Sequence, residues 1–150
     1  MSFPASSRLL CRTAFALYGI SLALPATFND TGVTGWGWRA AFLSLLALPA
    51  TAVTLDVVAV LSILPLPLSN LGFFAAAYLL SMRRPLRALV ASIVSVASMV
   101  YVAFLVPEQP SELLNEPAGR LGPGYYLWLM AGVVMLVAAA RTSRAATGER

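Results

Sequence analysis

The sequence predicts an all-α fold, a polytopic bundle of membrane-spanning helices. Of its 150 residues, 59% are hydrophobic and only 11% are charged. A soluble domain carries about 25% charged residues, so this balance is typical of a membrane protein. Apolar runs of about twenty residues recur, which is the length that a helix needs to cross about 30 Å of hydrocarbon. We therefore expect a single membrane domain over residues 1–150, without β-strands.

Four spans are expected, over residues 9–28, 66–82, 86–106 and 124–140. Residues 36–65 are also apolar but contain Pro49 and Pro65, and a proline ring breaks the hydrogen-bond ladder of a helix. This stretch is expected to form a re-entrant or interfacial hairpin on the outer side. Residues 40–82 are long enough for two spans, so the alternative is a chain of five spans with its N-terminus outside.

The arginines allow the two threadings to be compared. All ten basic residues are arginine, and they stand at the ends of the apolar runs. Four spans place eight of them inside and two outside, whereas five spans place seven inside and three outside. Both agree with the enrichment of basic residues in cytoplasmic loops. In the four-span threading the orientation is set by Arg8, Arg12, Arg83, Arg84, Arg87, Arg141 and Arg144.

The aromatic residues favour four spans. Tyrosine and tryptophan gather at membrane interfaces, where their rings lie at headgroup level. Four spans place six such rings at the outer interface, whereas five spans separate two of them from the rest: Trp36 and Trp38 from Tyr101, Tyr125, Tyr126 and Trp128. We therefore expect a multi-pass protein with both termini in the cytoplasm. The alanine-rich, lysine-free composition indicates a bacterial inner membrane.

Asp56 is the one acid in the apolar stretch between Pro49 and Pro65. Acids within a membrane are costly and usually functional, so Asp56 is a candidate for proton or cation coupling in a small transporter. In the four-span threading it lies near the outer interface, where it is hydrated or caps a helix. In the five-span threading it lies nearer the middle of the membrane.

The string GRLGPGYYLWL, from Gly119 to Leu129, predicts an outer turn followed by the last span. Pro123 suits the first turn of a helix, where its missing N–H is not needed. The rings that follow suit an interface. Together with two earlier rings they form a candidate surface for a lipid, a quinone or a partner: Trp36, Trp38, Tyr125, Tyr126 and Trp128. In the third span, small residues form a stripe that suits close helix packing: Ala88, Ala91, Ser95, Ser98 and Val102.

The strings GPGYYLWL, ALPATFND and LSNLGFFAAAYLL resemble a family of small bacterial membrane proteins of uncharacterised function. That family has GYYLWLAS before its last helix and an asparagine that opens its second full span. Asn70 and residues 125–129 match this pattern, whereas Pro67, Leu68 and Ser69 stand where the family has other residues. The resemblance implies four spans and no particular activity.

Enzyme activity is not expected. Nucleophilic catalysis needs a base beside the nucleophile, and the chain has no histidine and no lysine. No metal site or cofactor is expected either, because thiolate pairs and imidazoles are missing. Nucleic acid is not an expected partner, since no basic patch is interleaved with aromatic residues. Glu108, Glu112 and Glu116 have a helical spacing in the loop before the last span, which is expected to be a solvated outer loop.

These observations leave three functional hypotheses open. The first is a non-enzymatic membrane protein that acts through contacts, as an accessory, assembly or immunity-type subunit. It would bind another membrane protein or a second copy of itself through the outer rings and the acidic loop. The second is a small proton- or cation-coupled transporter that uses Asp56. The third is a lipid or quinone binder, which predicts an apolar pocket beneath the outer rings.

Overall fold

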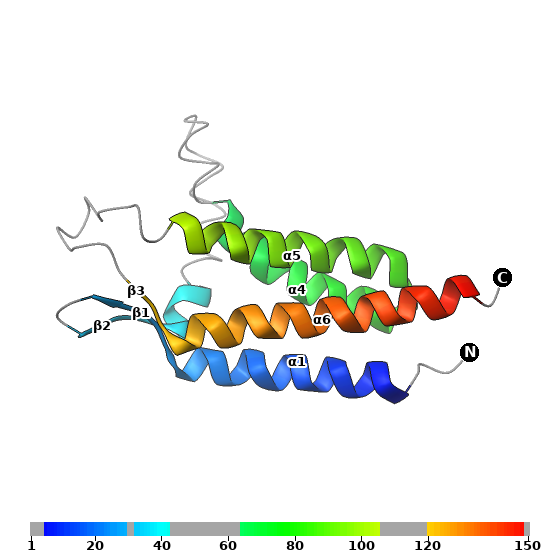
Figure 1. Ribbon diagram of the computed structural model, residues 1–150, viewed down its shortest axis with the longest axis horizontal. Coiled ribbons are helices and arrows are strands. Elements are labelled where there is room, and N and C mark those ends of the chain that lie inside the picture. Colours follow the sequence, from blue (N-terminus) through cyan, green and yellow to red (C-terminus); the bar gives the residue numbers. More distant parts are fainter. Residues whose placement is uncertain (1–4, 30–31, 43–63, 106–119, 149–150) are drawn as a thin grey trace.

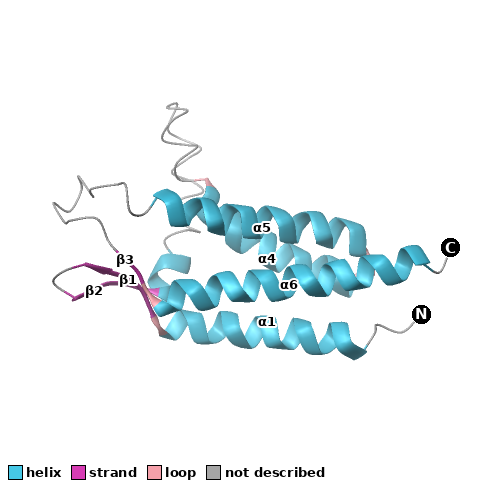
Figure 2. Cartoon of the chain, in the orientation of Figure 1, coloured by secondary structure: helices cyan, strands magenta, loops and turns pink. Residues whose placement is uncertain are grey.

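The computed structural model describes residues 5–29, 32–42, 64–105 and 120–148. Four long helices, α1 (Ala5–Ala23), α4 (Pro65–Ser81), α5 (Pro85–Leu105) and α6 (Pro123–Gly148), lie side by side as a bundle (Figure 1). The start of α1 and the end of α6 lie at one end of the bundle, which we call the terminal end. A small sheet lies at the opposite, sheet end (Figure 2). The fold is thus mostly helical, as predicted.

The helices form a closed ring. Helix α6 packs against α1 and α5, and α5 packs against α4. Helix α4 then meets α1 through aromatic rings, because Phe73 stacks on Tyr18 at a centroid distance of 4.9 Å and contacts Phe15 edge-on at 5.4 Å. Much of the remaining core consists of small side chains, which let helices approach closely. These buried alanines are Ala14, Ala76, Ala88, Ala131, Ala138 and Ala139.

The helix bounds lie close to the predicted spans except at three places, of which one is the start of α1 at Ala5, four residues before the predicted start at Leu9. The first helix ends at Ala23, five residues before the predicted end at Phe28, because Pro25 cannot continue a helix and disfavours helical backbone before it. Helix α6 runs to Gly148, eight residues beyond the predicted end at Ala140. Its added turns carry Arg141, Arg144 and two alanines, which are good helix formers.

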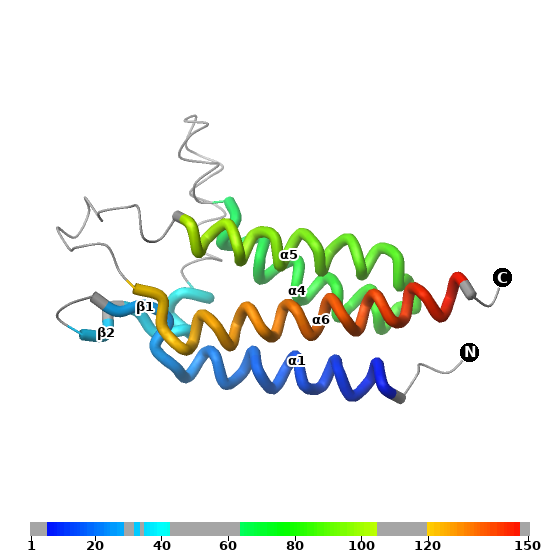
Figure 3. Tube along the Cα trace, viewed as in Figure 1, coloured from blue at the N-terminus to red at the C-terminus, as the bar shows by residue number. Residues whose placement is uncertain are grey.

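The expectation that the chain has no strands is wrong. Strands β1 (Pro25–Asn29) and β2 (Gly32–Trp36) pair as an antiparallel hairpin, and β3 (Arg120–Leu121) pairs with the other edge of β1. Threonine, valine and phenylalanine in these segments favour extended backbone. The sheet lies beyond the ends of α1 and α6 (Figure 3). It joins segments that the sequence separates by about ninety residues.

Glycines let three segments cross closely at the sheet end. The Gly37 N–H donates to the Leu24 carbonyl at 2.9 Å, and the Gly122 N–H donates to the Ala26 carbonyl at 2.8 Å. A Cβ at Gly124 would lie only 2.7 Å from the Leu24 oxygen. The end of α1, the helical residues 37–42 and the start of α6 are therefore held together by backbone contacts.

The predicted small-residue stripe of the third span is confirmed as a packing face. Ala88, Ser95 and Val102 are buried in the bundle. The Ser95 hydroxyl donates to the Ser69 carbonyl of α4 at 2.6 Å, which joins the two helices. At Gly72 of α4 an added Cβ would lie 2.9 Å from the Ala91 oxygen, so α4 and α5 approach closely here.

The turn between α4 and α5 places an arginine where glycine is usual. The Arg84 N–H donates to the Leu79 carbonyl at 2.9 Å, and the Arg83 N–H donates to the Leu80 carbonyl at 3.0 Å. This is the Schellman pattern of helix ends, which requires left-handed backbone at its turning residue. Arg83 has a φ of 58°. Left-handed backbone costs a residue with a Cβ about 1 kcal/mol relative to glycine.

We expect Arg83→Gly to leave the protein as stable as the parent or more stable. The substitution removes the left-handed strain, although glycine also gains freedom in the unfolded chain. The net gain in the free energy of unfolding is therefore below about 1 kcal/mol. A thermal melt of the purified protein in mild detergent measures it, and a clear fall in the melting temperature would contradict the turn geometry.

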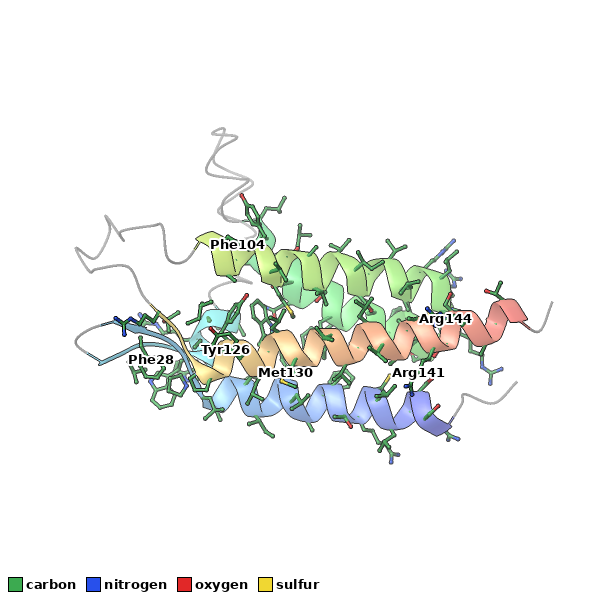
Figure 4. All side chains as sticks on the ribbon, in the orientation of Figure 1. Phe28, Phe104, Tyr126, Met130, Arg141 and Arg144 are labelled. Carbon is green, nitrogen blue, oxygen red and sulfur yellow. The ribbon has the colours of Figure 1, made fainter. Side chains whose placement is uncertain are left out.

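The bundle buries several polar side chains beside its apolar core and exposes many large apolar ones. The buried polar residues are Ser7, Ser21, Ser69, Asn70, Ser92, Ser95 and Ser98. Phe104 and Met130 are exposed (Figure 4). Other exposed large apolar side chains are Ile20, Phe74, Val90, Ile93 and Val133. Helices α5 and α6 are long and apolar enough to cross a membrane, over Pro85–Phe104 and Pro123–Thr147.

Candidate functional site

The arginines are distributed unequally between the two ends of the bundle. Arg39 and Arg120 lie at the sheet end. Arg141 and Arg144 lie at the terminal end (Figure 4). Within the described ranges the chain contains no acidic side chain, so these groups have no carboxylate partner there. In all, seven arginines lie at the terminal end: Arg8, Arg12, Arg83, Arg84, Arg87, Arg141 and Arg144.

The five rings of the predicted outer surface do not all face outward. Trp36, Trp38 and Tyr126 are exposed at 45%, 57% and 56%. Tyr125 is only 5% exposed, and Trp128 is half-buried. The Tyr125 hydroxyl donates to the Met99 carbonyl of α5. The geometry therefore divides the set into three surface rings and two rings that face the interior of the bundle.

A buried asparagine joins three helices near the sheet end. Asn70 of α4 is 3% exposed. Its Oδ1 accepts a hydrogen bond from the Tyr18 hydroxyl of α1 at 2.9 Å and another from the Trp128 Nε1–H of α6 at 3.2 Å. A single side-chain oxygen thus fixes the relative positions of α1, α4 and α6. Because the two donors belong to the long side chains of Tyr18 and Trp128, the two bonds also set the directions in which these rings point.

A cavity of about 110 Å³ lies beside this asparagine, at the sheet end. Segments far apart in the sequence contribute its walls, from the end of α1 to the start of α6. The surface that faces the space is almost wholly carbon. Its walls include Leu22, Ala26, Leu66, Val102, Leu121 and Trp128.

The polar groups around the cavity are mostly engaged with the protein itself. The Ser21 hydroxyl donates to the Tyr18 carbonyl at 2.6 Å. Trp128 donates to Asn70, and Tyr125 donates to Met99. The cavity therefore offers van der Waals contact and a low-dielectric space, and little hydrogen bonding. Such a site suits hydrocarbon or an uncharged ring.

Several predicted site residues lie outside the described residues. These are Asp56, the candidate coupling site, and the acidic loop residues Glu108, Glu112 and Glu116. The proposed hairpin over residues 36–65 is described only at its two ends. The transporter hypothesis therefore stays a prediction. In the described residues no three histidine, cysteine, aspartate or glutamate side chains lie close enough to hold a metal ion.

Sequence reasoning missed Tyr18 and Ser21 as parts of this region. Both lie in the first helix, on the turns that approach the cavity. The available signal was modest: Tyr18, Ser21 and the later Asn70 are polar residues within otherwise apolar runs. Polar residues in such runs usually face a partner helix. Comparisons with protein-family models, with curated proteins and with solved structures found no match.

Proposed function

We propose that this chain is a small, non-enzymatic, four-span membrane protein that binds the hydrocarbon part of a membrane-dissolved molecule at its outer end. The observation that supports this class of ligand is the carbon-lined cavity at the sheet end. It agrees with the lipid or quinone hypothesis, which required an apolar pocket beneath the outer rings.

The exposed apolar side chains support a membrane location for all four helices. Soluble proteins rarely expose large contiguous apolar patches. Here every long helix presents exposed large apolar residues, such as Phe15 of α1, Phe74 of α4, Ile93 of α5 and Met130 of α6. Helix α4 has 17 residues, which rise about 25 Å and suit a thin or locally adapted bilayer.

The path of the chain supports four spans. Ala40 and Ala41, before residues 43–63, line the same cavity as Leu66, which follows them. The described residues on both sides of 43–63 therefore lie at the same end of the bundle. A single additional crossing by that segment would require its two ends to lie at opposite ends. The four-span threading needs no such crossing. The start of α1 and the end of α6 lie at the same end of the bundle (Figure 1), as an even number of spans requires.

The charge asymmetry supports an orientation with both termini in the cytoplasm. Seven described arginines lie at the terminal end and two at the sheet end. Basic residues close to span ends favour the cytoplasmic side. We therefore place the cavity and the sheet on the periplasmic side of a bacterial inner membrane.

The size and lining of the cavity restrict the ligand. A dry apolar cavity of about 150 Å³ in another protein holds benzene, so the present space fits one ring or the end of one chain. A charged headgroup would lose its hydration there without a partner. The ligand class is therefore an acyl or isoprenoid chain, including the tail of a quinone.

We expect Val102→Phe to block this binding. Val102 is 5% exposed and lines the cavity, so the added ring occupies the space. Dibrominated stearic acid, added to detergent-solubilised protein that carries Trp36→Phe and Trp38→Phe, should quench Trp128 fluorescence saturably. Val102→Phe should abolish the saturable component and leave the melting temperature within a few degrees.

Val100→Phe is the matched control. It makes the same substitution two residues away on α5, at a side chain that is 39% exposed and does not line the cavity. Quenching should therefore match that of the parent. Equal quenching curves for Val102→Phe and Val100→Phe, with both proteins folded, would exclude the cavity as the binding site.

The exposed rings favour contact with a partner protein as a second candidate function. Trp36 and Trp38, at and just after the end of β2, are about half exposed. Tryptophan often dominates the binding energy of protein interfaces. We expect a Trp36→Ala, Trp38→Ala double variant to lose a partner recovered by crosslinking in membranes, while Asp56→Asn retains it. Loss of coupled proton release in proteoliposomes on Asp56→Asn would instead support the transporter.

A further inference from the structure

We propose that a groove at the terminal end binds the phosphate of an anionic lipid headgroup. The groove lies between the α4–α5 turn and the last turns of α6, far from the cavity at the sheet end. The proposal rests on the membrane orientation proposed above, which places this groove in the inner leaflet. Its chemistry is independent of the cavity.

The groove is large and open, with a volume of about 450 Å³. Arg83, Arg84 and Arg87 line one side, from the α4–α5 turn and the first turn of α5. Ser143 and Thr147 of α6 line the other side. The Thr147 hydroxyl donates to the Ser143 carbonyl at 2.9 Å, so its oxygen is oriented as an acceptor. The Ser143 hydroxyl can donate to a bound oxygen.

The charges of the groove match phosphate. A guanidinium presents a planar set of N–H donors that binds two oxygens of one phosphate at once. The described residues contain no carboxylate to compete for the three arginines. Three arginines around one groove and a hydroxyl can together satisfy a doubly charged phosphate or the single charge of a phosphodiester.

Apolar neighbours favour a lipid over free phosphate. Leu86 lines the groove and is 67% exposed. Met82 in the same turn is 50% exposed, and Val90 one turn further along α5 is 56% exposed. An acyl chain can lie along these side chains while its phosphate meets the arginines. Free phosphate would leave the apolar part of the site unused.

The backbone at Arg83 provides an independent sign that its charge matters. The turn geometry suits glycine, yet an arginine occupies the left-handed position and belongs to the groove lining. Strained backbone often accompanies a functional group that must be held in place. Arg83→Gly therefore separates the stability of the fold from the charge of the groove, because glycine favours the turn but removes one positive charge from the lining.

The test measures lipid retention by native mass spectrometry of the full-length protein in mild detergent. Phosphatidylglycerol and phosphatidylcholine with identical chains are the probes. We expect the parent to retain phosphatidylglycerol more tightly. Each groove arginine should contribute about fivefold, so Arg83→Gly weakens retention about fivefold and the Arg84→Gln, Arg87→Gln double variant about twenty-fivefold.

Arg141→Gln is the matched control for net charge. Arg141 lies on the same end of α6 but not in the groove lining, and helical geometry places it on the opposite face from Ser143 and Thr147. Arg141→Gln removes one positive charge and should leave the preference for phosphatidylglycerol unchanged. An equal loss in Arg141→Gln and Arg83→Gly would overturn the proposal, because general charge would then explain the preference.

Two further outcomes are decisive. Equal retention of the two lipids by the parent would show that no anionic site exists. Displacement of phosphatidylglycerol by millimolar inorganic phosphate would overturn the lipid assignment in favour of free phosphate. The Arg84→Gln, Arg87→Gln variant should keep the saturable quenching of Trp128, and Val102→Phe should keep phosphatidylglycerol, so failure of either site is distinguishable from failure of the other.

Discussion

Gly72→Leu is expected to destabilise the bundle by about 3 kcal/mol or more, the largest effect of any single change considered for the fold. A Cβ at position 72 would lie 2.9 Å from the Ala91 carbonyl oxygen and 2.9 Å from the Ser95 Cβ. The first of these is backbone, which cannot move aside as a flexible side chain can. Helices α4 and α5 must therefore separate, which also weakens the bond from the Ser95 hydroxyl to the Ser69 carbonyl.

Gly19→Leu is the control for this substitution. Gly19 lies in α1, and a Cβ added there meets no atom within 4 Å. Leucine is the better helix former by roughly 0.8 kcal/mol, so the melting temperature in mild detergent should stay or rise. If Gly72→Leu melts at the same temperature as Gly19→Leu, α4 and α5 do not approach each other as described.

Asn70→Leu is expected to cost about 1–3 kcal/mol. Leucine branches at the same carbon and is larger, but it has no acceptor, so the Tyr18 hydroxyl and the Trp128 Nε1–H both lose their shared partner. Tyr18 is 8% exposed, which leaves its hydroxyl little access to another acceptor. The loss should appear as a lower melting temperature in detergent and as a weaker association of α1 with α4.

A double-mutant cycle separates this bond from other effects of the substitution. Tyr18→Phe should destabilise the parent but change little in the Asn70→Leu background, with a coupling energy of about 1 kcal/mol. Ser92→Ala is the control, because the Ser92 hydroxyl only donates back to the Ala88 carbonyl of its own helix at 2.9 Å. Additive costs for Tyr18→Phe and Asn70→Leu would show that the bond contributes no stability.

The helices could be predicted because their signals are local. The second and third predicted spans, 66–82 and 86–106, each differ by one residue at either end from α4 and α5. Pro85 and Pro123 begin their helices at the position where a proline costs nothing. The stripe on α5 could be predicted for the same reason, since spacing along one helix determines which residues share a face.

The sheet and the cavity could not be predicted because they depend on contacts between distant segments. Strand β3 has two residues, Arg120 and Leu121, and carries no periodic signal of its own. Asn70 could be singled out as a polar residue in an apolar run. Its donors, Tyr18 and Trp128, depend on the rotation of three helices about their axes, which composition does not determine. The burial of Tyr125 follows from the same rotation.

Labelling of single cysteines in intact cells tests the membrane topology most directly. In a Cys11→Ala background, Val33→Cys and Met82→Cys place an exposed thiol at the sheet end and at the terminal end, at side chains that are 45% and 50% exposed. A maleimide that cannot cross the inner membrane should label position 33 in intact cells and position 82 only after lysis. Labelling of position 82 in intact cells would contradict the four-span orientation, and the assignment of both sites to their leaflets with it.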